Sequence, residues 1–296
     1  MAKHSKKKLS PFGKIHGGKC YLARRLIELT PDLEHCGIKR VVEACGGLAS
    51  WMLNLEAPTR QNPRMEVYND INGGLNNLFQ VLQQHPLKLQ KALAVTPYAK
   101  QEFMRAQALE YCSHAPLNVK QQVEDARRTF VLMQQSQGGR MRDWSQTKNR
   151  TRRGICDVVS GWLAKIHEDM PAIVQRITEW QFDDQDVNDC LHYYDDTHTM
   201  FYLDPPYLPE TRTTPKVYVY EMTYDEHEEM LQTILTLGAY VMLSGYDSAL
   251  YRRYLKRKDG WFKTKIEIAN HASKAKEKER RIECVWTNYR PSTSSS

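Results

Sequence analysis

The sequence of 296 residues has no apolar run long enough to cross a membrane, which takes ~18 consecutive apolar residues. Its lysine-rich start, Met1–Leu9, is not followed by the apolar segment of a secretory signal. Hydrophobic residues at 41% and charged residues at 26% are typical of water-soluble globular proteins. We therefore expect a soluble cytoplasmic protein with no membrane partner.

Cysteine pairs with the spacing of a metal site are also missing. The seven cysteines are odd in number and scattered, and no two form a C-x-x-C pair. This argues against a disulfide framework and against a zinc site. We expect reduced, mostly structural thiols and no bound metal.

A strong charge of one sign is absent as well, because the 42 Lys and Arg residues are nearly balanced by 35 Asp and Glu residues, which leaves a net charge of +7. This modest excess is compatible with a polyanionic partner but does not require one. The distribution is more informative. One short segment combines six basic residues with Trp144, which is suited to base contact, and predicts a nucleic-acid surface. The six are Arg140, Arg142, Lys148, Arg150, Arg152 and Arg153.

Short apolar segments predict the strands of an α/β fold. The first is followed by small residues and then by Trp51-Met52-Leu53, which predicts strand, tight turn and helix. The second precedes a helical pattern that runs from Leu75 to Leu82. This β-α-β-α order predicts a parallel sheet with right-handed crossovers. The predicted strands cover residues 41–43, 65–68, 199–203, 239–244 and 282–287.

The middle of the chain differs in character from its two ends. Residues 87–176 contain long polar helical stretches and no convincing strand, which predicts a helical insertion. A chain of this length can bury one large core with such an insertion, but hardly two independent domains. We expect a discontinuous catalytic domain of residues 10–86 and 177–290, a helical domain of 87–176 and a disordered tail of 291–296.

The most informative stretch is Phe201–Tyr207, in which an apolar strand leads into Asp204, Pro205, Pro206 and Tyr207. Ligands of open α/β sheets bind at the carboxyl ends of the strands. Proline fixes φ and lacks an amide hydrogen, so the carbonyl groups here should point outward. An alternative is an ordinary turn in which the aspartate caps a helix.

This motif suits an exocyclic amine, which is a poor nucleophile because its lone pair is conjugated with the ring. Two acceptors that hold the amine hydrogens would favour a pyramidal nitrogen aimed at a methyl donor. The Asp204 carboxylate and the Pro205 carbonyl are the candidate acceptors. Tyr207 would stack on the face of the base.

Other stretches accompany this motif. Lys14–Lys19 contains Gly-Gly-Lys, and Glu43–Ser50 forms a small-residue loop after the first strand. Asn69-Asp70 ends the second strand, where an acidic residue receives ribose hydroxyls in nucleoside-binding folds. Asp70 could instead cap the helix that follows. The acid-rich segment Phe182–Asp186 precedes the strand that carries Asp204.

In this order the stretches resemble the Dam-type DNA adenine methyltransferases of the α-class, and the resemblance extends in pieces from about Lys14 to Tyr289. It implies a Rossmann-like methyltransferase sheet with an inserted helical target-recognition domain. It also implies methyl transfer from S-adenosyl-L-methionine to adenine N6. The stretches Ser244–Tyr246 and Glu283–Tyr289 also match the family, where their role is largely architectural.

The resemblance assigns cofactor contacts to the matching residues. The amino-terminal motif gives Lys14, Ile15, Gly17, Gly18 and Lys19, with isoleucine where the family usually has tryptophan. The loop gives Glu43, Cys45, Gly46, Gly47, Leu48, Ala49 and Ser50. The other two stretches give Asn69, Asp70, Ile71, Gln185 and Asp186, and Asp183 and Asp184 stay open as alternatives to Asp186.

Two loop positions depart from the family pattern. Cys45 replaces the usual phenylalanine, and Ala49 replaces the second glycine. We expect a tight turn to accept these changes if φ at Ala49 stays negative.

The reaction implies double-stranded DNA as partner, since an adenine must leave the helix before its amine can react. The resemblance places DNA contacts in the insertion and just past the catalytic motif, and a solvated basic face is the alternative. We expect a monomer that associates with the nucleoid. The candidate DNA-binding residues are Arg140, Arg142, Trp144, Lys148, Arg150, Arg152, Arg153 and Arg212.

Other functions remain open at this point. The same chemistry would serve an amine of RNA adenine, cytosine N4 or a protein amide. A non-catalytic DNA-binding protein could keep the fold without turnover. The motif order and the basic insertion favour DNA adenine.

Overall fold

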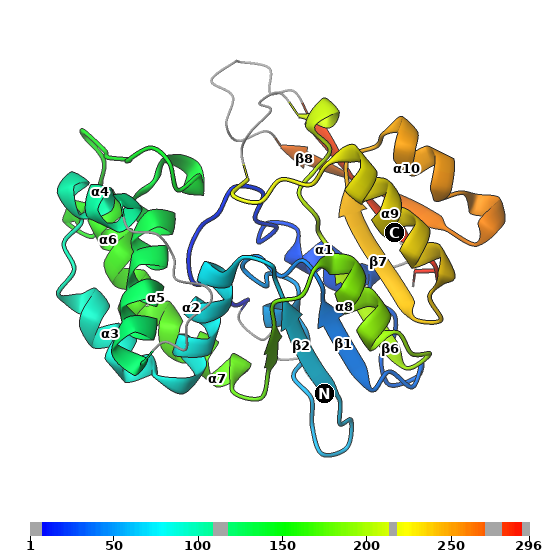
Figure 1. Ribbon diagram of the computed structural model, residues 1–296. Coiled ribbons are helices and arrows are strands. Elements are labelled where there is room, and N and C mark those ends of the chain that lie inside the picture. Colours follow the sequence, from blue (N-terminus) through cyan, green and yellow to red (C-terminus); the bar gives the residue numbers. More distant parts are fainter. Residues whose placement is uncertain (1–7, 109–117, 213–217, 270–279, 292–296) are drawn as a thin grey trace. The chain divides into compact units, whose positions relative to one another are not determined.

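The computed structural model of the chain describes residues 8–108, 118–212, 218–269 and 280–291 (Figure 1). Two units are distinguished by their internal contacts. The first comprises Met1–Arg24, Gly47–Ala57 and Asn72–Asp184. The second comprises Arg25–Gly46, Pro58–Ile71 and Gln185–Ser296.

The second unit is built on a mostly parallel sheet (Figure 1). Its strands β2, β1, β6 and β7 are parallel neighbours in that order. The antiparallel strand β9 follows β7, and β8 pairs with β9. The bounds are β2 Met65–Asn69, β1 Arg40–Glu43, β6 Thr199–Leu203, β7 Tyr240–Gly245, β9 Arg280–Thr287 and β8 Phe262–Ala269. This arrangement confirms the predicted α/β fold.

The central strands β1, β6 and β7 are buried along nearly their whole length because both faces of the sheet are covered. All five residues of β6 are buried. Helices α8 and α9 pack against each other, and α10 packs against α9. Their apolar sides join the strands in one core that contains Phe201, Leu231 and Trp286. The bounds are α1 Ala23–Leu29, α8 Val187–Tyr194, α9 Tyr224–Thr236 and α10 Ala249–Tyr254, with a short 3-10 helix at each of Pro209–Thr211 and Arg257–Asp259.

The first unit is mainly helical, as predicted for residues 87–176. Helix α5 is its centre and packs against α2, α3 and α4. Aromatic rings fill the interior, where Phe130 stacks on Phe12 at 4.5 Å and lies 4.9 Å from Trp162 between centroids. The bounds are α2 Gly73–Gln84, α3 Pro86–Ala94, α4 Lys100–Ala108, α5 Val119–Gln135, α6 Asp157–Ala164, the π-helix Lys165–Asp169 and α7 Met170–Ile177.

Helix α2 packs on α5 within the first unit, whereas the predicted domain boundary at residue 87 separates them. The division into a catalytic and a recognition domain stays a prediction.

Three details of the predicted secondary structure are wrong. The segment after the first loop forms only a 3-10 helix, Met52–Asn54, because the chain turns extended at Leu55. The insertion contains a small antiparallel pair, β3 Thr151–Arg152 and β4 Ile155–Cys156. Strands β8 and β5 (Gln181–Asp183) were not predicted. Strand β8 does carry a strand pattern, in which Lys263, Lys265 and Glu267 alternate with mostly apolar residues.

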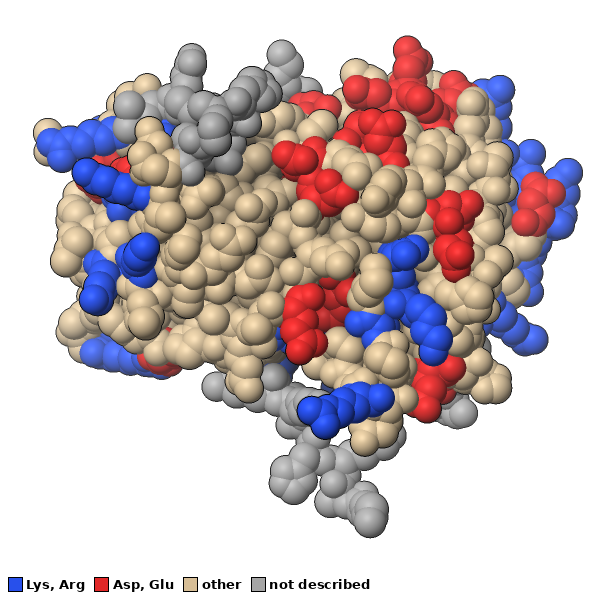
Figure 2. All heavy atoms as spheres, turned by 60° about the horizontal axis from the view of Figure 1, so that its bottom comes forward, with Lys and Arg blue, Asp and Glu red and all other residues tan. Residues whose placement is uncertain are grey.

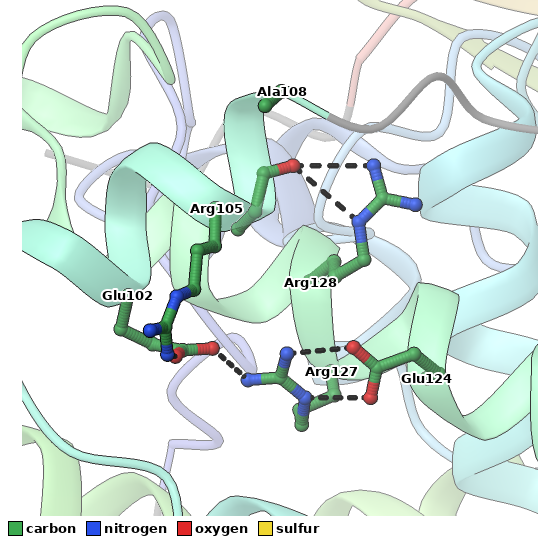
Figure 3. A pocket seen from close by; sticks show the side chains of 7 residues that line it. Glu102, Arg105, Ala108, Glu124, Arg127 and Arg128 are labelled. Atoms are coloured by element: carbon green, nitrogen blue, oxygen red, sulfur yellow. Dashed lines mark hydrogen bonds and ion pairs between the residues drawn. The ribbon is translucent and has the colours of Figure 1, made fainter.

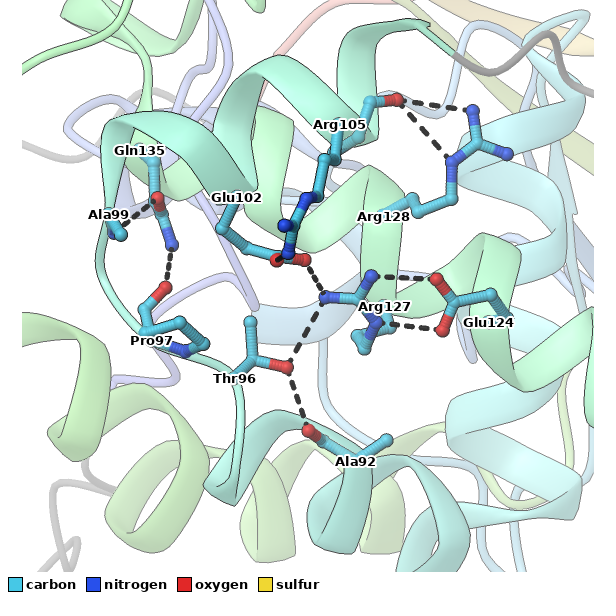
Figure 4. A network of polar contacts seen from close by, with 11 residues as sticks. Ala92, Thr96, Pro97, Ala99, Glu102, Arg105, Glu124, Arg127, Arg128 and Gln135 are labelled. Carbon is cyan, nitrogen blue, oxygen red and sulfur yellow. Dashed lines mark hydrogen bonds and ion pairs between the residues drawn. The ribbon is translucent and has the colours of Figure 1, made fainter.

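A hollow of about 450 Å³ lies between α4 and α5 (Figure 3). Arg127 is held there by Glu102 at 2.5 Å and by Glu124 at 2.6 Å, and these hydrogen bonds raise its pKa. Arg128 donates to the carbonyl of Ala106 near the end of α4. Thr96 and Gln135 extend the same polar network (Figure 4). Arg127 and Arg128 of α5 therefore link this helix to α4.

Candidate active site

The Asp-Pro-Pro-Tyr motif directly follows β6, as predicted. In the parallel pair of β6 and β7, Leu203 is opposite Leu243, so Asp204 is next to Ser244. The Ser244 hydroxyl donates to Asp204 Oδ1 at 3.0 Å. The Tyr202 hydroxyl lies 3.0 Å from the same Ser244 oxygen. The carboxylate is therefore held by a residue of the neighbouring strand.

A buried histidine holds the middle of the motif. His227 Nε2 is 2.9 Å from the Pro206 carbonyl, and the Tyr251 hydroxyl is 3.2 Å from Nδ1. Burial lowers the pKa of His227 to about 4. A neutral imidazole has one donor and one acceptor, so Nε2–H donates to Pro206 while Nδ1 accepts from Tyr251. The Pro206 carbonyl is thus tied to α9.

The last residue of the motif is fixed through its hydroxyl and its ring. Tyr207 is buried, and its hydroxyl donates to the buried carboxylate of Glu283 on β9. The half-exposed ring of Tyr246 packs against Tyr207 with a centroid distance of 4.6 Å and an interplanar angle of 63°. Stacking of Tyr207 on a base stays a prediction.

Asn69 connects three segments of the second unit. Its side-chain nitrogen donates to the carbonyls of Ala44 at 2.9 Å and Gln185 at 3.1 Å. Its side-chain oxygen accepts from the Gln185 amide at 3.0 Å. Its own carbonyl accepts from the Gly46 amide at 2.8 Å. The Asn69 side chain therefore shapes the site, and the contact with the cofactor predicted for it stays a prediction.

Cys45 lies in the electrostatic field of three predicted acids. Burial raises the pKa of its thiol, and the carboxylates of Asp70, Asp204 and Asp186 raise it further. Glu43 is opposite both Tyr68 of β2 and Tyr202 of β6, so the loop after β1 begins beside the carboxyl ends of these two strands. Beside Cys45, a Cβ on Gly46 would overlap the Tyr68 ring, so this position requires glycine.

Of the two acids predicted to contact the cofactor, Asp186 caps a helix and Asp70 does not. Asn72, not Asp70, caps α2 and accepts from the Gly74 amide. Helix capping therefore does not explain Asp70. Asp186 is exposed and caps α8 through the Asn188 amide at 2.9 Å. Ile71, after Asp70, is 50% exposed and offers an apolar surface.

The predicted amino-terminal motif forms a turn in the first unit. The Gly18 amide donates to the Ile15 carbonyl at 3.2 Å, and Gly17 has a φ of +82°. The backbone of this turn rests on Gly139, whose Cβ, if present, would lie 2.5 Å from the Lys14 carbonyl oxygen. Lys19 is buried, and burial lowers the pKa of Lys14. No pattern in the sequence indicated that Gly139 supports this turn.

The loop after Gly46 corrects one expectation. Gly47 has a φ of +51°, as a glycine allows. Ala49 also has a φ of +51°, so the condition on which we expected the turn to accept alanine, a negative φ, is not met. The Leu53 amide donates to the Ala49 carbonyl at 2.9 Å, and the alanine is fully buried, which together hold this backbone in place.

The predicted basic DNA-binding residues of the insertion lie at its surface, whereas Trp144 is only partly exposed and its indole nitrogen is buried. Arg140, Arg142 and Lys148 are exposed. The β3–β4 turn contains Arg153, which has a φ of +55° and pairs with Glu168. On the face shown in Figure 2, basic and acidic side chains form small separate groups. Charge on this face therefore does not by itself mark a DNA surface.

Arg212, the predicted DNA contact outside the insertion, is not a simple surface residue. Its side chain is 6% exposed and pairs with Glu221 at 2.7 Å. Its guanidinium lies 5.2 Å from the centroid of the Tyr218 ring. Its contact with a phosphate stays a prediction.

Two searches of the described residues found no candidates. These parts of the chain contain no group of three or more His, Cys, Asp or Glu residues arranged to hold a metal ion. No helix among them is long and apolar enough to span a membrane.

The family comparison agrees with this geometry. Residues 16–273 match the model of the D12 class N6 adenine-specific DNA methyltransferases. The chain belongs to this family. It is therefore a DNA adenine-N6 methyltransferase, which confirms the predicted enzyme class. A search of curated proteins found no match.

Sequence reasoning missed the side chains that hold the catalytic motif of this methyltransferase. Ser244 and Glu283 lie in stretches that it regarded as architectural, and His227 was not singled out. Their contacts span from 21 to 76 residues of sequence. The only signal was the position of Ser244 at the end of a predicted strand.

Proposed function

We propose that this methyltransferase transfers the methyl group of S-adenosyl-L-methionine to N6 of an adenine flipped out of duplex DNA at specific sites. Family membership supports the reaction in general. The observation that carries the finer proposal is the Asp204 carboxylate, held by the Ser244 hydroxyl at the end of β6.

The residues present suit this cofactor. Asp70, at the end of β2 and not used as a cap, is placed for a ribose hydroxyl pair. The exposed Ile71 beside it suits the face of the cofactor adenine. The cofactor supplies an electrophilic methyl group on a sulfonium. The cofactor contacts of Gly17, Gly18 and Lys19 stay a prediction.

The catalytic motif would act on the amine of the target adenine. In our proposal the Asp204 carboxylate and the Pro205 carbonyl accept its two hydrogens, which localises the nitrogen lone pair. The nitrogen that gains a methyl group must lose a proton, and the carboxylate is the nearest proposed acceptor. The bond from His227 to Pro206 supports this backbone by fixing the next carbonyl.

DNA would be held by the basic residues of the insertion, with Arg212 near the target. Base flipping follows from the reaction, because the amine inside a duplex is out of reach. We propose that the enzyme acts as a monomer on the nucleoid in the cytoplasm.

The test is transfer of labelled methyl to adenine-containing duplex DNA, with the product base identified by mass spectrometry. We expect N6-methyladenine from the wild type and a loss of about 1000-fold or more in Asp204→Ala. Asp196→Ala, which removes an exposed carboxylate of the same unit, is the matched control and should be fully active.

Methylated RNA, cytosine or protein in place of methylated adenine would support a different acceptor. Binding of DNA and cofactor without any product would contradict the proposed function. Full activity of Asp204→Ala would contradict the role of the motif.

A further inference from the structure

Three polar side chains share one face of the sheet at the end of β6. Side chains alternate along a strand, so Tyr202 and Asp204 point to the same side. The register pairs Tyr202 with Met242 and Leu203 with Leu243, which places Ser244 beside Asp204 on that side. The grouping is thus dictated by the pairing of β6 with β7.

The contacts form a chain of two hydrogen bonds. The Ser244 oxygen is 3.0 Å from Asp204 Oδ1 and 3.0 Å from the Tyr202 hydroxyl. Ser244 is fully buried, and Tyr202 is 1% exposed. In such a dry setting each hydrogen bond is electrostatically stronger than it would be in water.

The chemistry of the three groups fixes the direction of these bonds. An ionised carboxylate only accepts, so the single hydroxyl hydrogen of Ser244 must point to Asp204. The Leu203 carbonyl, at 3.4 Å, is the more distant alternative. Ser244 must then accept from Tyr202. Burial and the charge of Asp204 raise the pKa of Tyr202, so it remains a donor.

We propose that Ser244, supported by Tyr202, is a positioning residue that keeps the Asp204 carboxylate ionised and aimed at the target amine. This inference rests on the proposed role of Asp204. A donor that bonds to the charged form of an acid favours that form. Ser244 and Tyr202 therefore extend the pH range in which methyl transfer occurs to lower pH.

The experiment compares the single-turnover rate of methyl transfer to duplex DNA from about pH 4 to about pH 9. We expect Ser244→Ala to move the acid limb of the profile upward by about one pH unit. Tyr202→Phe should move it less in the same direction, and Ser244→Thr should restore it. Thr199→Val, which removes a buried hydroxyl from the other end of β6, should leave it in place.

Thermal unfolding shows which variants are folded, and the pH profile of the rate is interpreted only for these variants. If Ser244→Ala misfolds, the profile of Tyr202→Phe decides the matter. A profile that does not move, or that falls equally at every pH, would overturn the inference. If the wild type makes no product, the proposed function fails. If Asp204→Ala alone is inactive and the other variants match the wild type, only this inference fails.

Discussion

Ala49 adopts a backbone that L-residues avoid. Its φ of +51° costs roughly 1–2 kcal/mol relative to a right-handed conformation. Replacing a buried alanine by glycine usually destabilises a protein by about 1 kcal/mol, because a methyl group is lost and the unfolded chain gains freedom. At Ala49 the relieved strain should offset this cost.

We therefore expect Ala49→Gly to change the free energy of unfolding by less than about 0.5 kcal/mol. Ala239→Gly is the matched control, since Ala239 is similarly buried without a positive φ, and it should lose about 1 kcal/mol. Chemical denaturation of both variants measures the difference. Equal losses would show that the left-handed backbone is not strained.

At the scale of elements, the turn at Gly138-Gly139 supports the amino-terminal motif. Both glycines have positive φ, of +62° and +72°. A Cβ on Gly138 meets nothing within 4 Å, whereas one on Gly139 would lie 2.5 Å from the Lys14 carbonyl oxygen. A substitution at Gly138 therefore tests backbone strain alone, whereas one at Gly139 adds a clash with the amino-terminal motif.

We expect Gly138→Ala to lose about 1 kcal/mol of stability with unchanged cofactor affinity. Gly139→Ala should lose at least as much and also weaken S-adenosyl-L-methionine binding about tenfold, because residues 14–19 must shift. Isothermal titration calorimetry distinguishes the two. Unchanged affinity in Gly139→Ala would argue against a cofactor role for the motif.

The sequence predicted those elements whose signals are local. Strand β6 was predicted at its observed bounds because every residue from Thr199 to Leu203 is compatible with burial on both faces. The β3–β4 pair was missed because two-residue strands carry no periodicity. The bonds of Ser244, His227 and Glu283 to the motif depend on strand register and helix packing, which no local pattern encodes. Cysteine in place of phenylalanine at residue 45 likewise gave no hint that three carboxylates raise the pKa of its thiol.

For the whole molecule, the buried imidazole of His227 couples stability to pH. It contacts Pro206 and Tyr251, and among charged groups Arg212 lowers its pKa while Glu226 raises it. The pKa falls from 6.5 in the unfolded chain to about 4 in the fold, mainly through burial. Below pH 6.5 the unfolded state therefore binds the proton that the folded state excludes.

The resulting loss of stability is absent above about pH 6.5 and reaches about 3 kcal/mol as the pH falls to about 4. We expect His227→Gln, whose amide can still donate to Pro206, to be less stable than the wild type at pH 7. Its stability should fall less steeply with decreasing pH, because it lacks the loss caused by protonation of His227. Urea unfolding of both proteins between about pH 7 and about pH 5 measures it. Carboxylates titrate in the same range, so the decisive quantity is the difference between the two slopes. Parallel slopes would mean that His227 is protonated without cost, and that the neutral imidazole does not hold the motif.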